Sequence, residues 1–106
     1  MLRSAVGSRD EERDELPNGR VRIPDHVVHR SFDEETVLLN LETGQYHGLN
    51  QVAGRMLEAL EATGDAEDSA RRVAAEFDVP VERVEHDLAQ LLGQLRERGL
   101  VVVDER

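Results

Sequence analysis

The sequence predicts an α+β domain in which a three-stranded antiparallel sheet is followed by a three-helix cluster. Two observations lead to this prediction. Short runs of branched apolar residues, separated by turn residues, fill the chain up to about residue 49. From residue 50 onward, apolar residues recur at the three- and four-residue spacing of helices. A sheet covered by helices in this order gives a winged-helix-like arrangement.

One domain is expected after a polar N-terminal segment. Residues 1–20 mix charges of both signs and contain the turn-forming sequence Pro17-Asn18-Gly19. We therefore expect a disordered tail over residues 1–20 and a folded domain over residues 21–106. A chain of 106 residues suffices for one core.

Three strands are expected, at residues 26–32, 36–41 and 45–49. Asp33-Glu34-Glu35 separates the first two, and Glu42-Thr43-Gly44 separates the last two. Gly44 can adopt the positive φ that a tight hairpin turn needs. Short turns join antiparallel neighbours, so the middle strand has two partners. The third strand is then an edge, unless a terminal segment covers it.

The register of the second hairpin has two alternatives. A two-residue Thr43-Gly44 loop places Leu41 opposite Tyr46, whereas a three-residue loop places Leu41 opposite Gln45. A slip of one residue exchanges the two faces of a strand. The sequence therefore leaves open which of Tyr46 and His47 faces the core.

Three helices follow, at residues 50–62, 66–77 and 80–98. Asn50 is a suitable N-cap for the first, and Asp65 or Asp68 for the second. Pro80 fits the first turn of the third helix, and Gly99 is typical of the position after a helix end.

The third helix carries the widest apolar stripe of the three, formed by Val84, Leu88, Leu91, Leu92 and Leu95. Residues 100–103 are all apolar and predict a short terminal strand or an extended tail packed on the sheet.

The charge of the chain excludes several partner classes. Its net charge is −10, from 23 acidic and 13 basic residues, and such a field repels nucleic acids and anionic membranes. The absence of cysteine excludes disulfides and thiolate chemistry. No apolar run has the length of a membrane span or a signal peptide, which indicates a cytoplasmic protein.

No residue pattern indicates catalysis, a metal or a cofactor. His26 and His29 fall on opposite faces of a strand, and His47 and His86 are remote in sequence. The acidic clusters lie in predicted turns and helix caps, where carboxylates stabilise local structure. Nucleophile elbows, phosphate loops and dinucleotide fingerprints are absent. We therefore expect a protein that is not an enzyme and has no catalytic or metal-binding residues.

Binding of a peptide is the function that remains. An exposed strand edge offers unpaired N–H and C=O groups to which an extended peptide can add. Gly48, which has no side chain, lets a neighbour approach the third strand closely. Part of the stripe on the third helix can floor a groove beside that edge, although for any single leucine a core position is the simpler interpretation.

A winged-helix layout also raises DNA binding or a regulatory role. The natural recognition helix spans residues 80–98, where four acidic residues outnumber three arginines. A helix that enters the major groove needs the opposite charge. The charge of this helix therefore disfavours DNA binding, which is the rival hypothesis.

Two segments resemble a known family. They are ETVLLNLETGQYHGLNQVAGRMLEAL, which starts at Glu35, and VERVEHDLAQLLGQLRERGLVVV, which starts at Val81. The pattern is similar to PqqD-like recognition elements for ribosomally made, modified peptides (RiPPs), above all the small stand-alone B1-type members of lasso-peptide biosynthesis. The resemblance covers about residues 21–103.

The resemblance implies a non-catalytic adaptor that captures the leader segment of a precursor peptide. The leader adds as an antiparallel strand to the third strand, in a cleft against the third helix. A leader-removing cysteine protease and an ATP-dependent macrolactam synthetase then receive the precursor. Carried over to this chain, the peptide-binding residues are Gln45, Tyr46, His47, Gly48 and Leu49 on the strand, and Val84, Asp87, Leu88, Leu91 and Leu95 on the helix.

One alternative is an interaction domain paired with a larger modification enzyme. Another, within this resemblance, is a PqqD-type chaperone of a radical-SAM enzyme. That branch usually has Asp-Gly before the second helix, where this chain has Ala62-Thr63-Gly64-Asp65, which favours the lasso branch. Strand addition itself predicts that proline at His47, which lacks an N–H, weakens leader binding.

Overall fold

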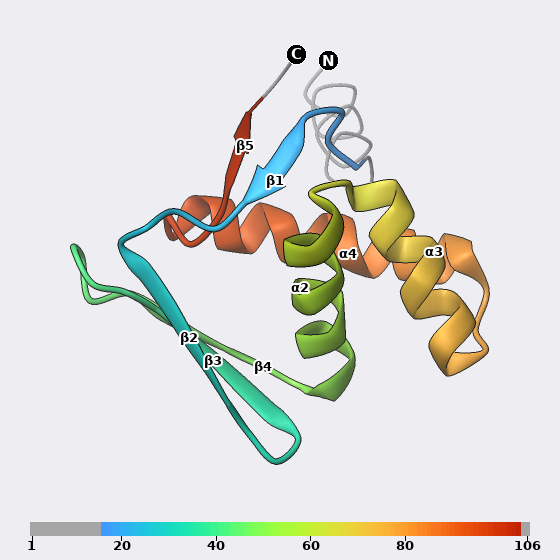
Figure 1. The fold of residues 1–106 in the computed structure, drawn as a ribbon, viewed down its shortest axis with the longest axis horizontal. Coiled ribbons are helices and arrows are strands. Elements are labelled where there is room, and N and C mark those ends of the chain that lie inside the picture. The colour runs from blue at the N-terminus through green and yellow to red at the C-terminus, as the bar shows by residue number, and fades with distance from the viewer. Residues whose placement is uncertain (1–15, 105–106) are drawn as a thin grey trace, which may run out of the picture.

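The computed structural model describes residues 16–104, and the predicted tail lies outside them over residues 1–15. Figure 1 shows a sheet beside a helical cluster, and a smaller pair of strands at the chain ends. The elements are β1 (Arg20–Arg22), β2 (Val27–Phe32), β3 (Glu35–Asn40), β4 (Tyr46–Leu49), α2 (Gln51–Thr63), α3 (Ala66–Phe77), α4 (Val81–Glu97) and β5 (Val102–Asp104). The α+β prediction of three antiparallel strands followed by three helices is confirmed.

The main sheet has the order β2-β3-β4, and both of its pairs are antiparallel. Asp33 and Glu34 form the two-residue turn between β2 and β3, and Asp33 takes a positive φ of 52°. Thr36, Leu38 and Asn40 of β3 face inward and are buried, whereas Val37 and Leu39 face outward and are half-buried. The alternation expected of a sheet with one covered face is therefore present.

The register between β3 and β4 differs from both alternatives derived from the sequence. Leu39 pairs with Tyr46 and Leu38 with His47, so the connection is the four-residue segment 41–44. The longer connection closes because Gly44, at φ 80°, donates its N–H to the Asn40 carbonyl oxygen at 2.8 Å. Tyr46 consequently points outward and is exposed, while His47 points toward the helices.

The helices begin and end where the sequence predicts, within two residues. The Asn50 side chain accepts a hydrogen bond from the Ala53 N–H at 2.9 Å and caps α2. Asp65, rather than Asp68, caps α3. Gly99 follows the end of α4 with φ 68°. Each cap satisfies N–H or C=O groups that lack a partner within the helix.

The terminal apolar segment forms a second sheet, which the sequence pattern did not predict. Strand β5 pairs with β1 and not with the main sheet, with Val21 opposite Val103. The Val21 N–H also donates to the Gly64 carbonyl oxygen after α2. Leu16 packs against the core and β1 begins at Arg20, both before the expected start of the domain at residue 21.

The core lies between the inward face of the main sheet and the three helices. Leu38, Leu57, Leu88, Leu95 and Leu100 are each at most 1% exposed. Full burial of one such side chain stabilises the folded chain by about 1.5–3 kcal/mol relative to exposure. This core holds α4 against the sheet and so positions it beside β4.

Candidate functional site

Strand β4 has a strand partner on one side only among residues 16–104. The Asn40 N–H donates to the Gln45 carbonyl oxygen at 2.8 Å. This bond fixes the phase of the ladder, that is, which residues of β4 direct their backbone groups toward β3. Because backbone groups alternate along an antiparallel strand, His47 bonds to β3 through its N–H and C=O. Those of Tyr46 and Gly48 therefore face away from the sheet. We call these outward groups of Tyr46 and Gly48 the β4 edge.

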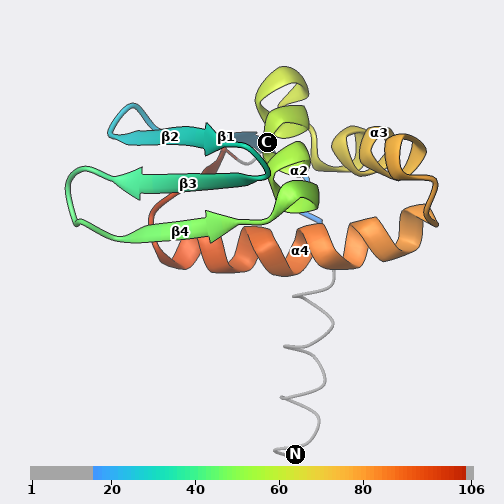
Figure 2. The same cartoon turned by 90° about the horizontal axis from the view of Figure 1, so that it is seen from below.

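In the view from below in Figure 2, α4 lies next to β4, and the residue after the helix end reaches the start of the strand. A hydrogen bond joins the two: the Arg98 Nη1 donates to the Tyr46 carbonyl oxygen at 3.1 Å. This bond independently supports the phase of the ladder, because the carbonyl it reaches is one that points away from β3. The helix and the strand edge thus flank the same space.

Asn40 sets the spacing between strand and helix. Its buried side-chain amide donates to the carbonyl oxygens of Gly99, at 3.2 Å, and Arg98, at 3.4 Å. Its side-chain oxygen accepts from the N–H groups of Glu42, at 2.9 Å, and Thr43, at 3.2 Å. One side chain therefore ties the turn before β4 to the end of α4.

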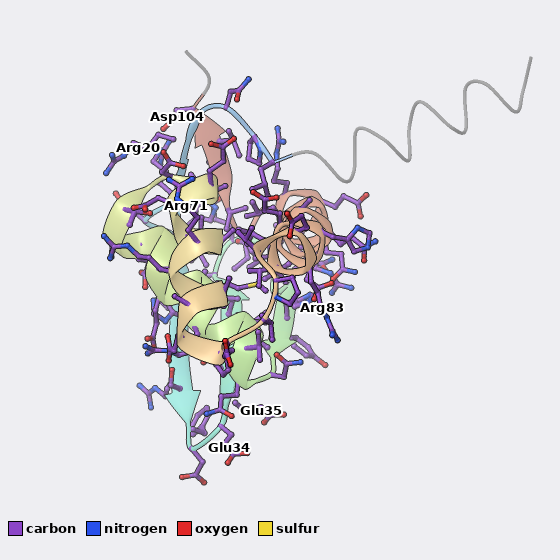
Figure 3. The ribbon with its side chains drawn as sticks, turned by 90° about the vertical axis from the view of Figure 1, so that its right-hand side faces the viewer. Arg20, Glu34, Glu35, Arg71, Arg83 and Asp104 are labelled. Atoms are coloured by element: carbon purple, nitrogen blue, oxygen red, sulfur yellow. The ribbon has the colours of Figure 1, made fainter. Side chains whose placement is uncertain are left out.

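Three surface pockets lie around β4. The turn pocket is at its start and is lined by Thr43, Gly44, Gln45, Tyr46 and Arg98. The helix pocket, of about 470 Å³, lies beyond its end and is lined by Asn50, Val52, Ala53, Met56, Val73, Phe77, Val79, Arg83, Val84, Asp87 and Leu91. A third pocket connects Gly48 and Leu49 with the turn between β2 and β3. Figure 3 shows Glu34 and Glu35 at that turn, and Arg83 near the start of α4.

The residues predicted for peptide binding fall into two groups. Tyr46 and Gly48 are exposed on β4, and Gln45 is exposed directly before it. Asp87 and Leu91 of α4 line the helix pocket.

The others are oriented toward the interior. Leu88 and Leu95 are 0% exposed and line none of these three pockets, so they act as core residues. Leu49 and Val84 are also buried, although each lines a pocket, and His47 is half-buried. Of the predicted residues of α4, Asp87 and Leu91 can therefore contact a bound peptide. Arg98, directly after the helix, can do so as well.

The phase of the ladder also corrects the proposed proline test. The N–H of His47 faces β3, so proline there breaks the hairpin itself. Gly48 is the position whose N–H faces outward, and a Cβ added to it would have no atom within 4 Å. Strand addition is therefore tested at Gly48.

The surroundings of His47 disfavour its charged form. Partial burial of the ring, and then the positive charge of Arg98, lower the pKa of His47 below its usual value of 6.5. A neutral imidazole has one nitrogen that accepts and one that donates. The surroundings of β4 therefore favour the neutral, polar form of the His47 side chain on its inward flank.

Within residues 16–104, no three His, Asp or Glu side chains come close enough together to hold a metal ion. In the same part of the chain, no helix combines the length and apolar character needed to cross a membrane.

Sequence comparison identifies the family. A model for coenzyme PQQ synthesis protein D (PqqD) matches residues 35–101, more than half of the chain. The chain belongs to the PqqD family. The matched segment starts at β3 and contains β4, its turn and all of α4. No curated protein is similar enough to match.

Two solved structures share the fold of this PqqD-family chain. The first is TbiB1 in complex with the TbiA(beta) leader peptide, which is 36% identical with a TM-score of 0.70. The match covers 78% of this chain and 99% of that one. The second is a lasso peptide synthetase B1 complexed with the leader peptide, 26% identical with a TM-score of 0.69, with 78% and 98% covered. The resemblance to PqqD-like RiPP recognition elements, and to B1-type members in particular, is confirmed.

Sequence reasoning missed the two residues that join strand and helix. Asn40 ends an apolar run, and a polar residue at an inward strand position is a signal for a buried hydrogen-bonding role. Arg98 carried no such signal, because its contact with Tyr46 spans 52 positions and depends on how α4 packs.

Proposed function

We propose that this protein is a non-catalytic adaptor that binds the leader segment of a ribosomally made precursor peptide. The leader adds as an antiparallel strand to the β4 edge and lies against α4. The observation that carries the proposal is the β4 edge, which has no strand partner in the described part of the chain. This chain shares its fold with two B1 proteins solved with leader peptides.

The geometry suits this form of binding. The N–H and C=O of Tyr46 and Gly48 face outward and can continue the ladder with any sequence, which gives affinity without selectivity. Selectivity then comes from side chains that enter the pockets at the two ends of β4. The helix pocket is mainly apolar, with Leu91, Phe77 and Met56 among its lining residues, and suits an apolar leader side chain.

Presentation of the bound precursor completes the proposed role. A leader-removing cysteine protease and an ATP-dependent macrolactam synthetase are the partners that the B1 relationship suggests. The adaptor supplies no catalytic residue and needs no cofactor; its contribution is to hold the leader so that the processing enzymes meet a tethered substrate.

A fluorescence-anisotropy titration tests leader binding. The probes are fluorescein-labelled leader peptides from the precursor genes beside this gene, with the TbiA(beta) leader as a reference and scrambled peptides as controls. Saturable binding that weakens less than about tenfold between about 50 and roughly 500 mM salt is expected, because main-chain hydrogen bonds dominate and few charges are screened. Failure of every native leader to bind would refute the proposal.

The family match supports one second candidate function. It is a PqqD-type chaperone of a radical-SAM enzyme, because the matching family model is the one for coenzyme PQQ synthesis protein D. The two candidates differ in the peptide that is bound and in the enzyme that receives it. Genes for a protease and a macrolactam synthetase beside this gene favour the lasso role, whereas a radical-SAM gene beside it favours the chaperone.

A further inference from the structure

Arg98 differs from the ion-paired arginines of this acidic chain because its side chain bonds to the backbone of β4. Arg22 pairs with Asp104, and Arg55 pairs with Glu58 and Glu76. The Arg98 guanidinium, by contrast, has no carboxylate within ion-pair distance among residues 16–104, and its side chain donates to a neutral backbone carbonyl. A cation without an anionic partner is therefore kept at the start of β4.

The carbonyl that Arg98 occupies belongs to the β4 edge. An incoming strand needs the Tyr46 carbonyl oxygen as an acceptor for its own N–H. The guanidinium lies on the outward side of that oxygen, so on docking it competes with the incoming N–H for the same acceptor. A guanidinium forms stronger hydrogen bonds with a carboxylate than with a neutral carbonyl, so a carboxylate on the incoming strand favours the exchange.

The position of Arg98 determines where that carboxylate must lie. Strand β4 runs from Tyr46 to Leu49, so an antiparallel peptide has its C-terminal end at Tyr46 and the turn pocket. Asn40 holds the Arg98 backbone, so the guanidinium stays within reach of this end. The net charge of −10 disfavours acidic residues along most of the peptide, and Arg98 offsets that repulsion at this end, as Arg83 can at the helix pocket.

We propose that Arg98 is a specificity-determining residue for the leader. On docking it leaves the Tyr46 carbonyl and pairs with an Asp or Glu side chain at the C-terminal end of the docked leader strand. This inference rests on the proposed function and adds to it the chemistry by which one end of the leader is selected.

A double-mutant cycle tests this pairing. The probe is the fluorescein-labelled native leader that binds most tightly, with each Asp and Glu replaced in turn by Asn or Gln. Against the unmodified protein, one replacement near the C-terminal end of the docked segment is expected to weaken binding about tenfold. Arg98→Gln is expected to weaken binding of the native leader by the same factor and to show no further loss with that replacement.

Charge reversal and a matched control complete the experiment. Arg98→Glu should bind the native leader least well and recover when the leader residue becomes Lys. Arg96→Gln makes the same change in net charge two residues away, on an exposed side chain, and should bind like the unmodified protein. Circular dichroism checks that each variant is folded, which is expected because the Arg98 side chain is exposed.

The outcomes separate the inference from the function it rests on. If Arg98→Gln binds the native leader as tightly as the unmodified protein, or keeps its preference for the carboxylate, the inference is wrong while leader binding stands. An equal loss in Arg96→Gln shows a general charge effect and also overturns it. If no leader binds the unmodified protein, the proposed function and this inference fail together.

Discussion

The main sheet has two outer strands, and within residues 16–104 the side chain that follows helix α4 reaches the outer edge of one of them, β4. Strand β2 is exposed from Val28 to Phe32, and a His29–Glu61 contact at 3.0 Å joins its inward face to α2. Strand β4 lies beside α4, receives a hydrogen bond from Arg98 at its edge and is surrounded by pockets. The difference shows that an unpaired edge becomes a candidate site through what lies next to it.

The largest expected effect compares two histidines that pair with the same residue. His29 and His47 flank Leu38 on opposite sides, but only His47 directs its N–H to β3. His47→Pro should lower the free energy of unfolding by about 3 kcal/mol, whereas His29→Pro should cost less than about 1 kcal/mol. Urea denaturation followed by circular dichroism measures both. Equal losses would contradict the assigned ladder phase.

The second prediction concerns leader affinity at the β4 edge. Gly48→Pro removes an outward N–H and places a ring beside the docking strand, so binding should weaken about 30-fold, or about 2 kcal/mol. Gly48→Ala keeps the N–H, and its methyl group enters open space, so binding should change less than about twofold. Anisotropy titrations compare the two variants. Similar affinities would argue against strand addition at β4.

The third prediction concerns the link between the two sides of the site. Asn40→Ala leaves carbonyl and N–H groups at both ends of its network without their partner, so stability should fall by about 1–2 kcal/mol. Leader affinity should fall with it, because the strand and α4 lose their fixed spacing. Glu42→Ala keeps the backbone N–H that Asn40 binds and serves as the control. A stable Asn40→Ala variant with native affinity would show that the spacing is set elsewhere.

The smallest expected effect is the pH response of His47. Its pKa is lowered in the folded chain, so below about pH 6.5 the unfolded chain takes up the proton first. Stability contributed by the neutral ring is therefore present above that pH and decreases as the pH falls toward the lowered value. In Arg98→Gln, the NMR titration midpoint of His47 should rise but stay below the usual value, since burial remains the larger cause. An unchanged midpoint would contradict the contribution of Arg98.

The order of strands and helices followed from local signals that the sequence carries directly. The Asn50 cap, Gly44 at positive φ and the apolar spacing of α4 depend on neighbours within a few positions. The pairing of β1 with β5 did not follow, because it joins residues about 80 positions apart and each strand is only three residues long. Local preference is too weak to specify such a pair.

The candidate site was predicted only in part, because some of its features depend on local sequence and others on how distant elements pack. The strand that bears the free edge was identified from its turn and from the family resemblance. Leu88 and Leu95 were assigned to the surface of the site, but the broad stripe on α4 contains more apolar residues than one face can expose. Which of them are buried depends on the rotation of the helix against the sheet, and no periodicity within α4 alone determines that rotation.

The hydrogen bonds of Asn40 also have a kinetic consequence. Because this one side chain holds the turn before β4 and the end of α4 together, both sides of the site are already spaced before any peptide arrives. Most of the ordering on association then falls to the peptide, and leaders that differ in their side chains should reach the edge at similar rates. Discrimination among them is expected in the lifetime of the complex, which the fit of side chains into the pockets prolongs.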